Sequence, residues 1–370
     1  MMVKVLHTGD LHLGIGHRSR NYPEALRSQL VEARIKTLEK LVETANREGC
    51  QLFVVTGDLF DRITVGKETV LKAVTVLARF DGCVAVLPGN HDYYDEFSSL
   101  WKTFREQAPE HVLLLSAESP YSLHDFGLDV VLYPAPCHRK HSAEHCLGWI
   151  STLQEKPAGT WHLGLAHGTV RGLSPDLADQ YFPMGQDELL ALGLDHWFLG
   201  HTHIRIPDVA TVRDCKFSYS GTPEPDGFDC AHGGWAWITE LADGYTASRA
   251  LATGTFRFRE VSWFVRSIEE LREQAQALGK EEHLLVKLSL QGVLPRKEYE
   301  ERLNCLRELE QQLTYLEWDD TELRLEISKE SIAEEFAVGS FPYLFLTELA
   351  EGDNNDALQV AYELIKDVMK

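Results

Sequence analysis

The chain has 370 residues, of which 44% are hydrophobic and 25% charged, and this ordinary globular composition excludes a disordered or fibrous protein. Its length exceeds that of one average domain and predicts a large domain followed by a smaller one. The 36 basic and 57 acidic residues give a net charge of −21, which argues against broad, sequence-independent adhesion to nucleic acid or anionic membranes.

Secretion and membrane insertion are not expected from this sequence. No apolar run approaches the roughly 18 residues that a membrane span needs, and the N-terminal residues lack the apolar core of a signal peptide. The seven cysteines are scattered without a C-x-x-C pair, which is typical of reduced thiols rather than of a disulfide framework. We therefore expect a cytoplasmic protein that does not associate with membranes.

Short apolar runs, each followed by a polar turn, predict buried strands in the first half of the chain. Between the first two runs, apolar residues recur at helical spacing from Leu26 to Ala45, which predicts a long amphipathic helix ended by Gly49. Strand, helix and strand in succession indicate a layered α/β domain. The strands are expected at residues 3–6, 52–55, 84–87, 163–166 and 197–199.

The pattern changes in the second half of the chain. Glycine-punctuated runs at 234–241 and 256–264 predict a second sheet that closes the domain. After residue 265, helix-like stretches at 268–278 and 297–313 alternate with strand-like stretches at 284–290 and 322–327, which indicates a small α+β unit. An amphipathic helix at 357–369 is expected to pack on its own domain or, alternatively, on a partner. We expect a large domain at residues 1–264, the small α+β domain at 265–340 and a helical C-terminal tail at 341–370.

Ligand-type side chains follow the predicted strands. Because the carboxyl ends of strands in an α/β sheet share one edge, these groups should converge there. In D-x-H and H-x-H, residues two apart in an extended chain also point the same way. Each motif alone is more typical of ordinary loops, but the full series favours a metal site. The predicted ligands are Asp10, His12, Asp58, Asn90, His167, His201 and His203.

The predicted ligand set contains oxygen and imidazole donors but no thiolate. Such donors favour Mn²⁺ over Cu(I) or a structural zinc, with Fe, Zn²⁺ or Mg²⁺ as alternatives. The set is too large for one ion and suits two divalent ions that share a bridging carboxylate. Paired metals of this kind are used to hydrolyse phosphate esters.

The motif series D-x-H, G-D-x-x-D, G-N-H-D, a lone His and G-H-T-H resembles the calcineurin-like metallophosphoesterase superfamily over residues 3–205. The residues at 7–14, the stretch Ser220 to Asp226 and the following Gly233-Gly234 are similar to those of SbcD-type DNA repair exonucleases. The resemblance implies a metallophosphoesterase sandwich of two mixed sheets flanked by helices. It also implies a small C-terminal α+β capping domain and a coiled-coil ABC-type ATPase partner.

The resemblance also implies a role for each motif residue. One metal would be held by Asp10, His12, Asp58 and His203. The other would be held by Asp58, Asn90, His167 and His201, with Asp58 bridging. His91 would protonate the leaving oxygen, and Asp61 would hold His91 charged and oriented. Some nuclease relatives have a histidine where Asp61 stands, so the second catalytic group is less firmly assigned than the ligands.

Several residues near the motifs are candidates for substrate contact. His17 and Arg18 follow the first ligand pair and can contact phosphates, although a solvated loop explains them equally well. Arg62 can contact the phosphate or form an ordinary surface ion pair. Tyr93 can stack on a base, although packing beneath its loop is the favoured interpretation.

Three functions are compatible with these features. The first is a metal-dependent DNA exonuclease or endonuclease subunit that acts in DNA repair or processing with an ATPase. The second is a phosphodiesterase or phosphatase acting on a small molecule, nucleotide or lipid. The third is a scaffold subunit of an ATPase complex, against which the complete ligand set and His91 argue. A homodimer is a further option for assembly.

Overall fold

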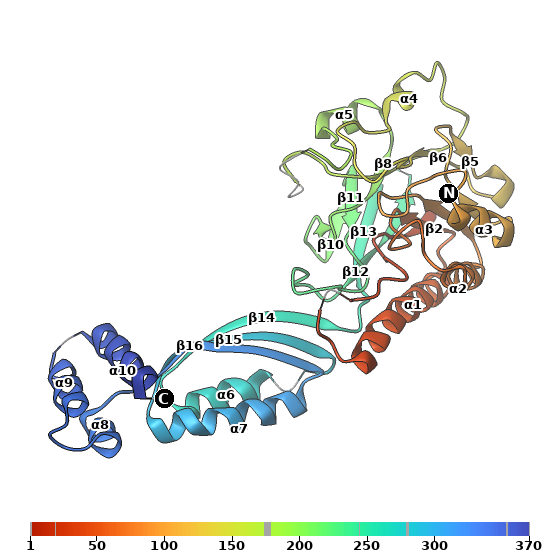
Figure 1. Cartoon of the computed structure of the whole chain (residues 1–370). Helices are drawn as coiled ribbons and strands as arrows, with labels where there is room; N and C mark the ends of the chain where they lie inside the picture. The colour runs from red at the N-terminus through yellow and green to blue at the C-terminus, as the bar shows by residue number, and fades with distance from the viewer. Residues whose placement is uncertain are drawn as a thin grey trace. The chain divides into compact units, whose positions relative to one another are not determined.

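The computed structural model describes residues 2–18, 20–173, 179–243, 245–278, 281–352 and 354–369. The chain divides into two units, Met1–Arg257 and Phe258–Lys370, and each is described by itself (Figure 1). Within the described ranges, none of the helices combines the length and the apolar run that crossing a bilayer requires.

The first sheet of the N-terminal unit has the strand order β10-β13-β12-β1-β2-β3-β4. β1, β2, β3 and β4 run parallel to one another, whereas β12 runs antiparallel to β1, so the sheet is mixed. Its strands are β1 (Val3–Thr8), β2 (Leu52–Thr56), β3 (Cys83–Leu87), β4 (Val112–Leu114), β10 (Thr211–Arg213), β12 (Trp235–Ala242) and β13 (Tyr245–Ala252).

The second sheet of this unit has the order β5-β6-β7-β8-β11-β9 and is also mixed. Two mixed sheets flanked by helices are the predicted fold class, which is confirmed. The strands are β5 (Tyr121–Ser122), β6 (Val130–Ala135), β7 (Trp161–His167), β8 (His196–Gly200), β9 (Arg205–Ile206) and β11 (Phe217–Ser220).

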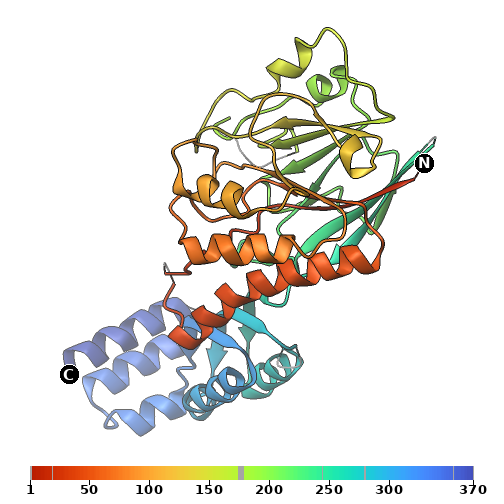
Figure 2. The same ribbon diagram turned by 90° about the vertical axis from the view of Figure 1, so that its right-hand side faces the viewer.

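Alternation along the strands divides the apolar residues of the N-terminal unit between an inner and two outer cores. Leu52 and Val54 of β2 pack between the sheets, whereas Phe53 and Val55 pack against helices. The helices cover the outer face of the first sheet (Figure 2). These helices are α1 (Glu24–Arg47), α2 (Lys67–Leu77) and α3 (Ser99–Gln107). The short elements η1 (His124–Phe126), α4 (Gly148–Ser151) and α5 (Gln186–Ala191) come after β5, and residues of α4 and α5 pack on the second sheet.

Helix α1 confirms the helix predicted from the apolar spacing. It begins after Pro23, whose fixed φ suits a helix start, and it buries Leu26, Leu30 and Leu38. The chain leaves the helix through Gly49, which has a φ of +67° that L-residues rarely adopt. The same helix also buries Arg34, which the apolar pattern did not reveal.

The second sheet predicted for residues 234–264 was wrong. β12 pairs with β1 and therefore extends the first sheet. β14 (Arg257–Val265) pairs instead in a third sheet with β15 (Leu284–Leu294) and β16 (Tyr315–Leu325). The predicted boundary after residue 264 consequently falls inside β14. Alternating side chains identify a strand but not the strand with which it pairs.

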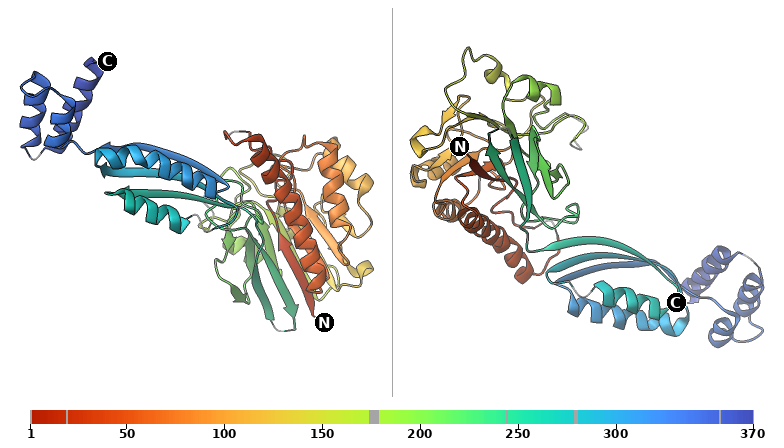
Figure 3. Two further views of the ribbon diagram at one scale, coloured as in Figure 1. Left: turned by 90° about the horizontal axis from the view of Figure 1, so that it is seen from below. Right: turned by 180° about the vertical axis from the view of Figure 1, so that it is seen from behind.

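In the C-terminal unit, α6 (Ile268–Leu278) and α7 (Arg296–Gln312) cover one face of the third sheet (Figure 3). Their apolar faces bury Leu271 and Leu306 against Leu284, Val286 and Leu288 of β15. This small α+β arrangement agrees with the element types expected after residue 265.

Three further helices pack on one another at the C-terminal end of the described chain. They are α8 (Lys329–Glu335), α9 (Phe341–Ala350) and α10 (Asn355–Met369). Ile332 and Phe336 at α8, Leu346 of α9, and Leu358 of α10 share one buried cluster. The helical region therefore begins with α8, within the segment 265–340 that the sequence assigned to the capping domain.

Candidate metal centre

The predicted metal ligands converge where the two sheets of the N-terminal unit meet. One or more of these ligands follow β1, β2 and β3 of the first sheet and β8 of the second sheet, and His167 is the last residue of β7. The sequence predicted that these groups converge at the carboxyl ends of their strands. The strands that carry them belong to both sheets, because the chain passes to the second sheet after β4. Parallel strands in both layers nevertheless bring their carboxyl ends to the same region.

The backbone of most predicted ligands has an unusual conformation. These residues have positive φ values, which side chains other than glycine adopt at a cost of about 1–3 kcal/mol and which cluster at functional sites. The extended-chain reasoning for D-x-H and H-x-H was therefore wrong, because both residues of each pair have positive φ values. The residues are Asp10 (φ 55°), His12 (47°), Asp58 (51°), His201 (110°) and His203 (51°).

Two glycines allow the sheets to approach closely at the site. A Cβ on Gly57 would clash with the ring of His167, and one on Gly200 would clash with the backbone of Thr56. Nδ1 of His167 lies 2.8 Å from the carbonyl oxygen of Thr56. If Nδ1 donates to this carbonyl, Nε2 keeps the lone pair that a metal ligand needs.

The first group of ligands surrounds Asp10. Nε2 of His12 and Nε2 of His203 lie 3.0 Å apart, and Nε2 of His203 lies 3.8 Å from a carboxylate oxygen of Asp10. Asp58 contributes an oxygen 3.7 Å from Nε2 of His12. The ligand atoms of Asp10, His12 and His203 all lie within 4.8 Å of one another, a separation that one ion can span.

The second group lies on the other side of Asp58. Nε2 of His167 is 3.3 Å from an oxygen of Asp58 and 2.9 Å from the side-chain oxygen of Asn90. Nδ1 of His201 lies 3.2 Å from the same Asn90 oxygen. Asp58 thus contacts histidines of both groups, as a bridging carboxylate would.

The charges of the site also fit divalent cations. Burial raises the pKa of Asp10. Burial opposes ionisation of Asp58 as well, but His167 outweighs it and holds the pKa of Asp58 well below its usual range. The pKa of His167 is lowered by burial but raised more strongly by Asp58, to about 9. Buried carboxylates that face several imidazoles form the oxygen and nitrogen donor set that paired divalent metals take.

His91 lies at the edge of this centre. Its ring stands 4.8 Å from that of His12, and its backbone N–H donates to Asp58 over 2.8 Å. Nδ1 of His91 lies 3.0 Å from the backbone carbonyl oxygen of Asp61. The Asp61 carboxylate, which the sequence paired with His91, instead accepts two hydrogen bonds from Arg62, at 2.9 and 2.6 Å.

Asp92 supports the turn that carries Asn90 and His91, a role that the sequence did not reveal. Its carboxylate is fully buried and accepts hydrogen bonds from the backbone N–H groups of Phe60, at 3.0 Å, and Gly89, at 2.7 Å. Burial raises the pKa of Asp92 to about 7. The carboxylate therefore ties the turn after β3 to the loop after β2.

Three of the predicted substrate-binding residues line one cavity of about 710 Å³, which His203 also lines. They are His17, Arg18 and Arg62. His17 is buried, and burial lowers its pKa to about 4. Tyr93 is half-buried and does not line this cavity among the described residues.

The stretch Ser220 to Asp226, which served above only as a family resemblance, also contacts the centre. The Thr222 hydroxyl donates to the backbone oxygen of Asp10 over 2.8 Å. The carboxylate of Asp226 lies 3.5 Å from Nδ1 of His203. Burial raises the pKa of Asp226, but the charges of His203 and Arg34 outweigh this effect and lower it to about 2.

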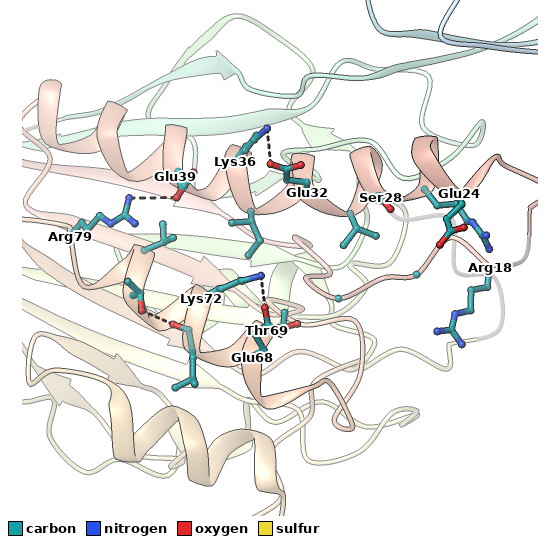
Figure 4. Close-up of a pocket in the computed structure, with 18 residues that line it drawn as sticks. Arg18, Glu24, Ser28, Glu32, Lys36, Glu39, Glu68, Thr69, Lys72 and Arg79 are labelled. Carbon is teal, nitrogen blue, oxygen red and sulfur yellow. Dashed lines mark hydrogen bonds and ion pairs between the residues drawn. The ribbon is translucent and has the colours of Figure 1, made fainter.

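A larger groove of about 920 Å³ lies between α1 and α2 (Figure 4). None of the predicted metal ligands lines it. Ion pairs typical of solvated helix faces cross or border it, and we assign it no chemistry. These pairs are Glu32–Lys36 at 2.8 Å, Glu68–Lys72 at 2.8 Å and Glu39–Arg79 at 3.5 Å.

A bacterial metallophosphoesterase is similar to this chain in sequence. Over 211 residues the chain is 28% identical to the uncharacterized metallophosphoesterase YhaO of Bacillus subtilis (strain 168), a match that covers 54% of this chain and 48% of YhaO. The match thus spans about half of the length of that relative.

Two solved structures show a weaker similarity to the chain. TT1561 of Thermus thermophilus is 11% identical with a TM-score of 0.39, and the match covers 65% of this chain and 94% of TT1561. A dimetal phosphatase from Danio rerio is 12% identical with a TM-score of 0.38, and the match covers 68% and 99% of the two chains.

The family model of calcineurin-like phosphoesterases matches residues 3–205, more than half of the chain and the segment that carries the predicted ligands. That family uses a dinuclear centre of divalent metals to hydrolyse phosphoesters, in agreement with the donor set described above. The chain therefore belongs to the calcineurin-like phosphoesterases.

Proposed function

We propose that the protein hydrolyses phosphodiesters in DNA, as an exonuclease or endonuclease subunit of SbcD type that acts in DNA repair or processing. The observation that carries this proposal is the 710 Å³ cavity beside the centre, which is larger than a single phosphate requires and whose lining includes three arginines together with three aspartates. The stretch Ser220 to Asp226 supports the SbcD relationship.

In this proposal the protein's own residues position the substrate and move one proton. Arg18 and Arg62 neutralise phosphate oxygens outside the scissile bond. His91 protonates the leaving oxygen, and the backbone carbonyl of Asp61 orients its ring. Two divalent metals, when bound, supply Lewis acidity and activate water. Mn²⁺ is the metal that we propose first, and Fe, Zn²⁺ and Mg²⁺ are the alternatives.

The partner proposed is an ATPase with a coiled coil. Exposed apolar side chains on α9 and α10 support an interaction surface there, because monomeric proteins rarely leave such groups in water together. Phe341 of α9 is 73% exposed, and Leu364 and Val368 of α10 are 62% and 87% exposed. A second copy of this chain is the alternative partner. Sedimentation of the purified protein distinguishes such a homodimer from a monomer.

A phosphodiesterase or phosphatase that acts on a small molecule, nucleotide or lipid fits the same centre. The net charge of −21 favours this alternative, because it disfavours a long polyanion. A scaffold without turnover is less well supported, since His91 and the ligands predicted for both metals are all present.

Substrate choice tests the proposal directly. Purified protein with Mn²⁺ is offered labelled single- and double-stranded DNA, bis-p-nitrophenyl phosphate and p-nitrophenyl phosphate. We expect cleavage of DNA and of the diester, and slower release of p-nitrophenol from the monoester. Intact DNA together with rapid cleavage of the monoester would favour the small-molecule phosphatase, and no turnover of any substrate would favour the scaffold.

A further inference from the structure

Behind the first group of ligands lies a carboxylate that no metal-ligand motif contains. Oδ2 of Asp226 is 3.5 Å from Nδ1 of His203, whereas Nε2 of the same ring faces His12 and Asp10. Asp226 is largely buried, with 14% of its side chain exposed. The two nitrogens of His203 thus face different partners, one a carboxylate and the other the metal centre.

The buried side chain of Arg34 lies next to Asp226. It is 1% exposed, and Nη1 donates to the carbonyl oxygen of Leu11 over 2.5 Å. Leu11 is the residue between the ligands Asp10 and His12. Nη2 lies 3.7 Å from Oδ2 of Asp226 and, among the described residues, has no hydrogen-bond partner. A buried guanidinium without a charged neighbour is strongly destabilising, so this arrangement favours an ionised Asp226.

We propose that Asp226 is a positioning residue for His203. The carboxylate accepts the Nδ1 proton of His203 and thereby directs the lone pair of Nε2 toward the metal next to Asp10. Carboxylates in this position fix the tautomer and orientation of a metal-binding histidine and raise its basicity. Arg34 contacts both Asp226 and the backbone between Asp10 and His12, and so links the positions of the two segments. The inference rests on the proposed metal assignment, in which His203 binds one of two ions.

A second arrangement of the same residues is also testable. The ligand atoms of His203, Asp226 and Cys230 lie within 4.8 Å of one another, as the ligands of a separate ion would. A third ion held by Asp226 and Cys230 would make Asp226 a ligand rather than a positioning residue. The two arrangements differ in the number of ions bound and in the effect of removing the thiol.

The test measures Mn²⁺ binding to the full chain by calorimetry and by electron paramagnetic resonance, which separates paired from isolated ions. Wild type should bind two Mn²⁺ as a coupled pair. D226N should lower the affinity for one Mn²⁺ by about 10–100-fold and leave the affinity for the other unchanged. Its resonance spectrum should be that of isolated Mn²⁺. D226E should restore part of the loss. D229N is the matched control, because Asp229 lines the same cavity and is exposed.

Three other outcomes would overturn the inference, and each has a different meaning. Two coupled ions of wild-type affinity in D226N would exclude the positioning role while leaving the metal centre intact. Three ions in wild type, with the same loss in C230A as in D226N, would make Asp226 a ligand. Wild type that binds no Mn²⁺ would overturn the proposed centre as well. Thermal melts of the metal-free variants show whether any loss of binding reflects unfolding.

Discussion

His91 is the described residue that the proposed chemistry depends on most directly. Its ring stands beside the centre, but it belongs to neither predicted set of ligands. We expect H91N to lower kcat by at least about 100-fold, the usual contribution of a general acid, and to leave the affinity for Mn²⁺ unchanged. Parallel kinetics and calorimetry check this. Loss of metal in H91N would show that His91 is a ligand instead.

Asp61 is expected to matter much less than His91. The atom of Asp61 that contacts His91 is its backbone carbonyl oxygen, which survives substitution of the side chain. D61A should therefore lower kcat by less than about 10-fold. If the carboxylate oriented His91, its removal would lower kcat by about 100-fold or more, as removal of other general acid–base groups does. R62A, which removes the partner of the Asp61 carboxylate, shows how much of any loss in D61A comes from the release of Arg62. A loss in D61A as large as that in H91N would restore the role predicted from the sequence.

The sequence predicted which residues gather at the centre, but not how the chain presents them. Histidine and aspartate after buried strands are recognisable because their position relative to the strand determines where they lie. The contact between His91 and a backbone carbonyl depends on a turn, and every residue has such a carbonyl. Asp226 was not predicted because it belongs to no metal-ligand motif that follows a strand, and its approach to His203 depends on the fold.

At the scale of elements, Glu224 connects α1 through hydrogen bonds to the last residues of the N-terminal unit. It is 2% exposed and accepts hydrogen bonds from the Thr37 hydroxyl, at 2.6 Å, and the Phe256 N–H, at 2.9 Å. E224A leaves these donors buried without a partner and should lower the free energy of unfolding by about 3 kcal/mol.

Chemical denaturation measures this loss. The matched control is E39A, which removes an exposed ion pair to Arg79 and should cost less than about 1 kcal/mol. Equal losses in the two variants would show that Glu224 does not fasten α1.

The buried His196, the first residue of β8, makes stability depend on pH. Burial lowers its pKa from 6.5 to about 4, and its ring nitrogens contact the Cys215 carbonyl oxygen and the Ser218 hydroxyl. Below pH 6.5 the unfolded chain takes up a proton that the folded chain takes up only near pH 4. Stability is therefore lost as the pH falls through this window, by about 2 kcal/mol from this residue between pH 7 and 5.

Urea unfolding of metal-free protein at the two pH values checks this prediction. H196N should reduce the difference between the two free energies of unfolding by about 2 kcal/mol. H138N, which changes an exposed histidine, should leave the difference unchanged. An unaltered pH dependence in H196N would contradict the prediction.

The elements themselves were largely predictable, whereas their partners were not. β2, β3 and α1 follow directly from apolar runs and helical spacing, since their faces are buried as those patterns require. The pairing of β12 with β1 joins segments far apart in sequence, and local patterns carry no signal for it. Helix α8 is short, with only Ile332 buried, so its periodicity was too brief to detect.

At the scale of the whole molecule, the negative charge lies unevenly between the two units. Residues 258–370 carry 13 basic and 25 acidic residues, whereas residues 1–257 carry 23 and 32. Two divalent cations at the centre would neutralise Asp10 and Asp58 and add positive charge there. Attraction of a phosphodiester is therefore expected to be local and to depend on metal.

DNA binding by the isolated chain tests this expectation. H91N, which should keep its metals without cleaving DNA, is titrated with labelled DNA while fluorescence anisotropy is recorded. We expect weak binding without metal, stronger binding with Mn²⁺, and a loss of affinity as salt rises. Tight binding without metal would contradict the electrostatic account.

The central claim is that paired divalent metals at this centre drive phosphodiester hydrolysis. The most direct measurement is hydrolysis of bis-p-nitrophenyl phosphate by chelated protein during titration with Mn²⁺. We predict no turnover without metal, recovery that reaches its plateau at two Mn²⁺ per chain, and no recovery in H91N. Hydrolysis that persists in the chelated protein, or a plateau at one ion per chain, would contradict the account.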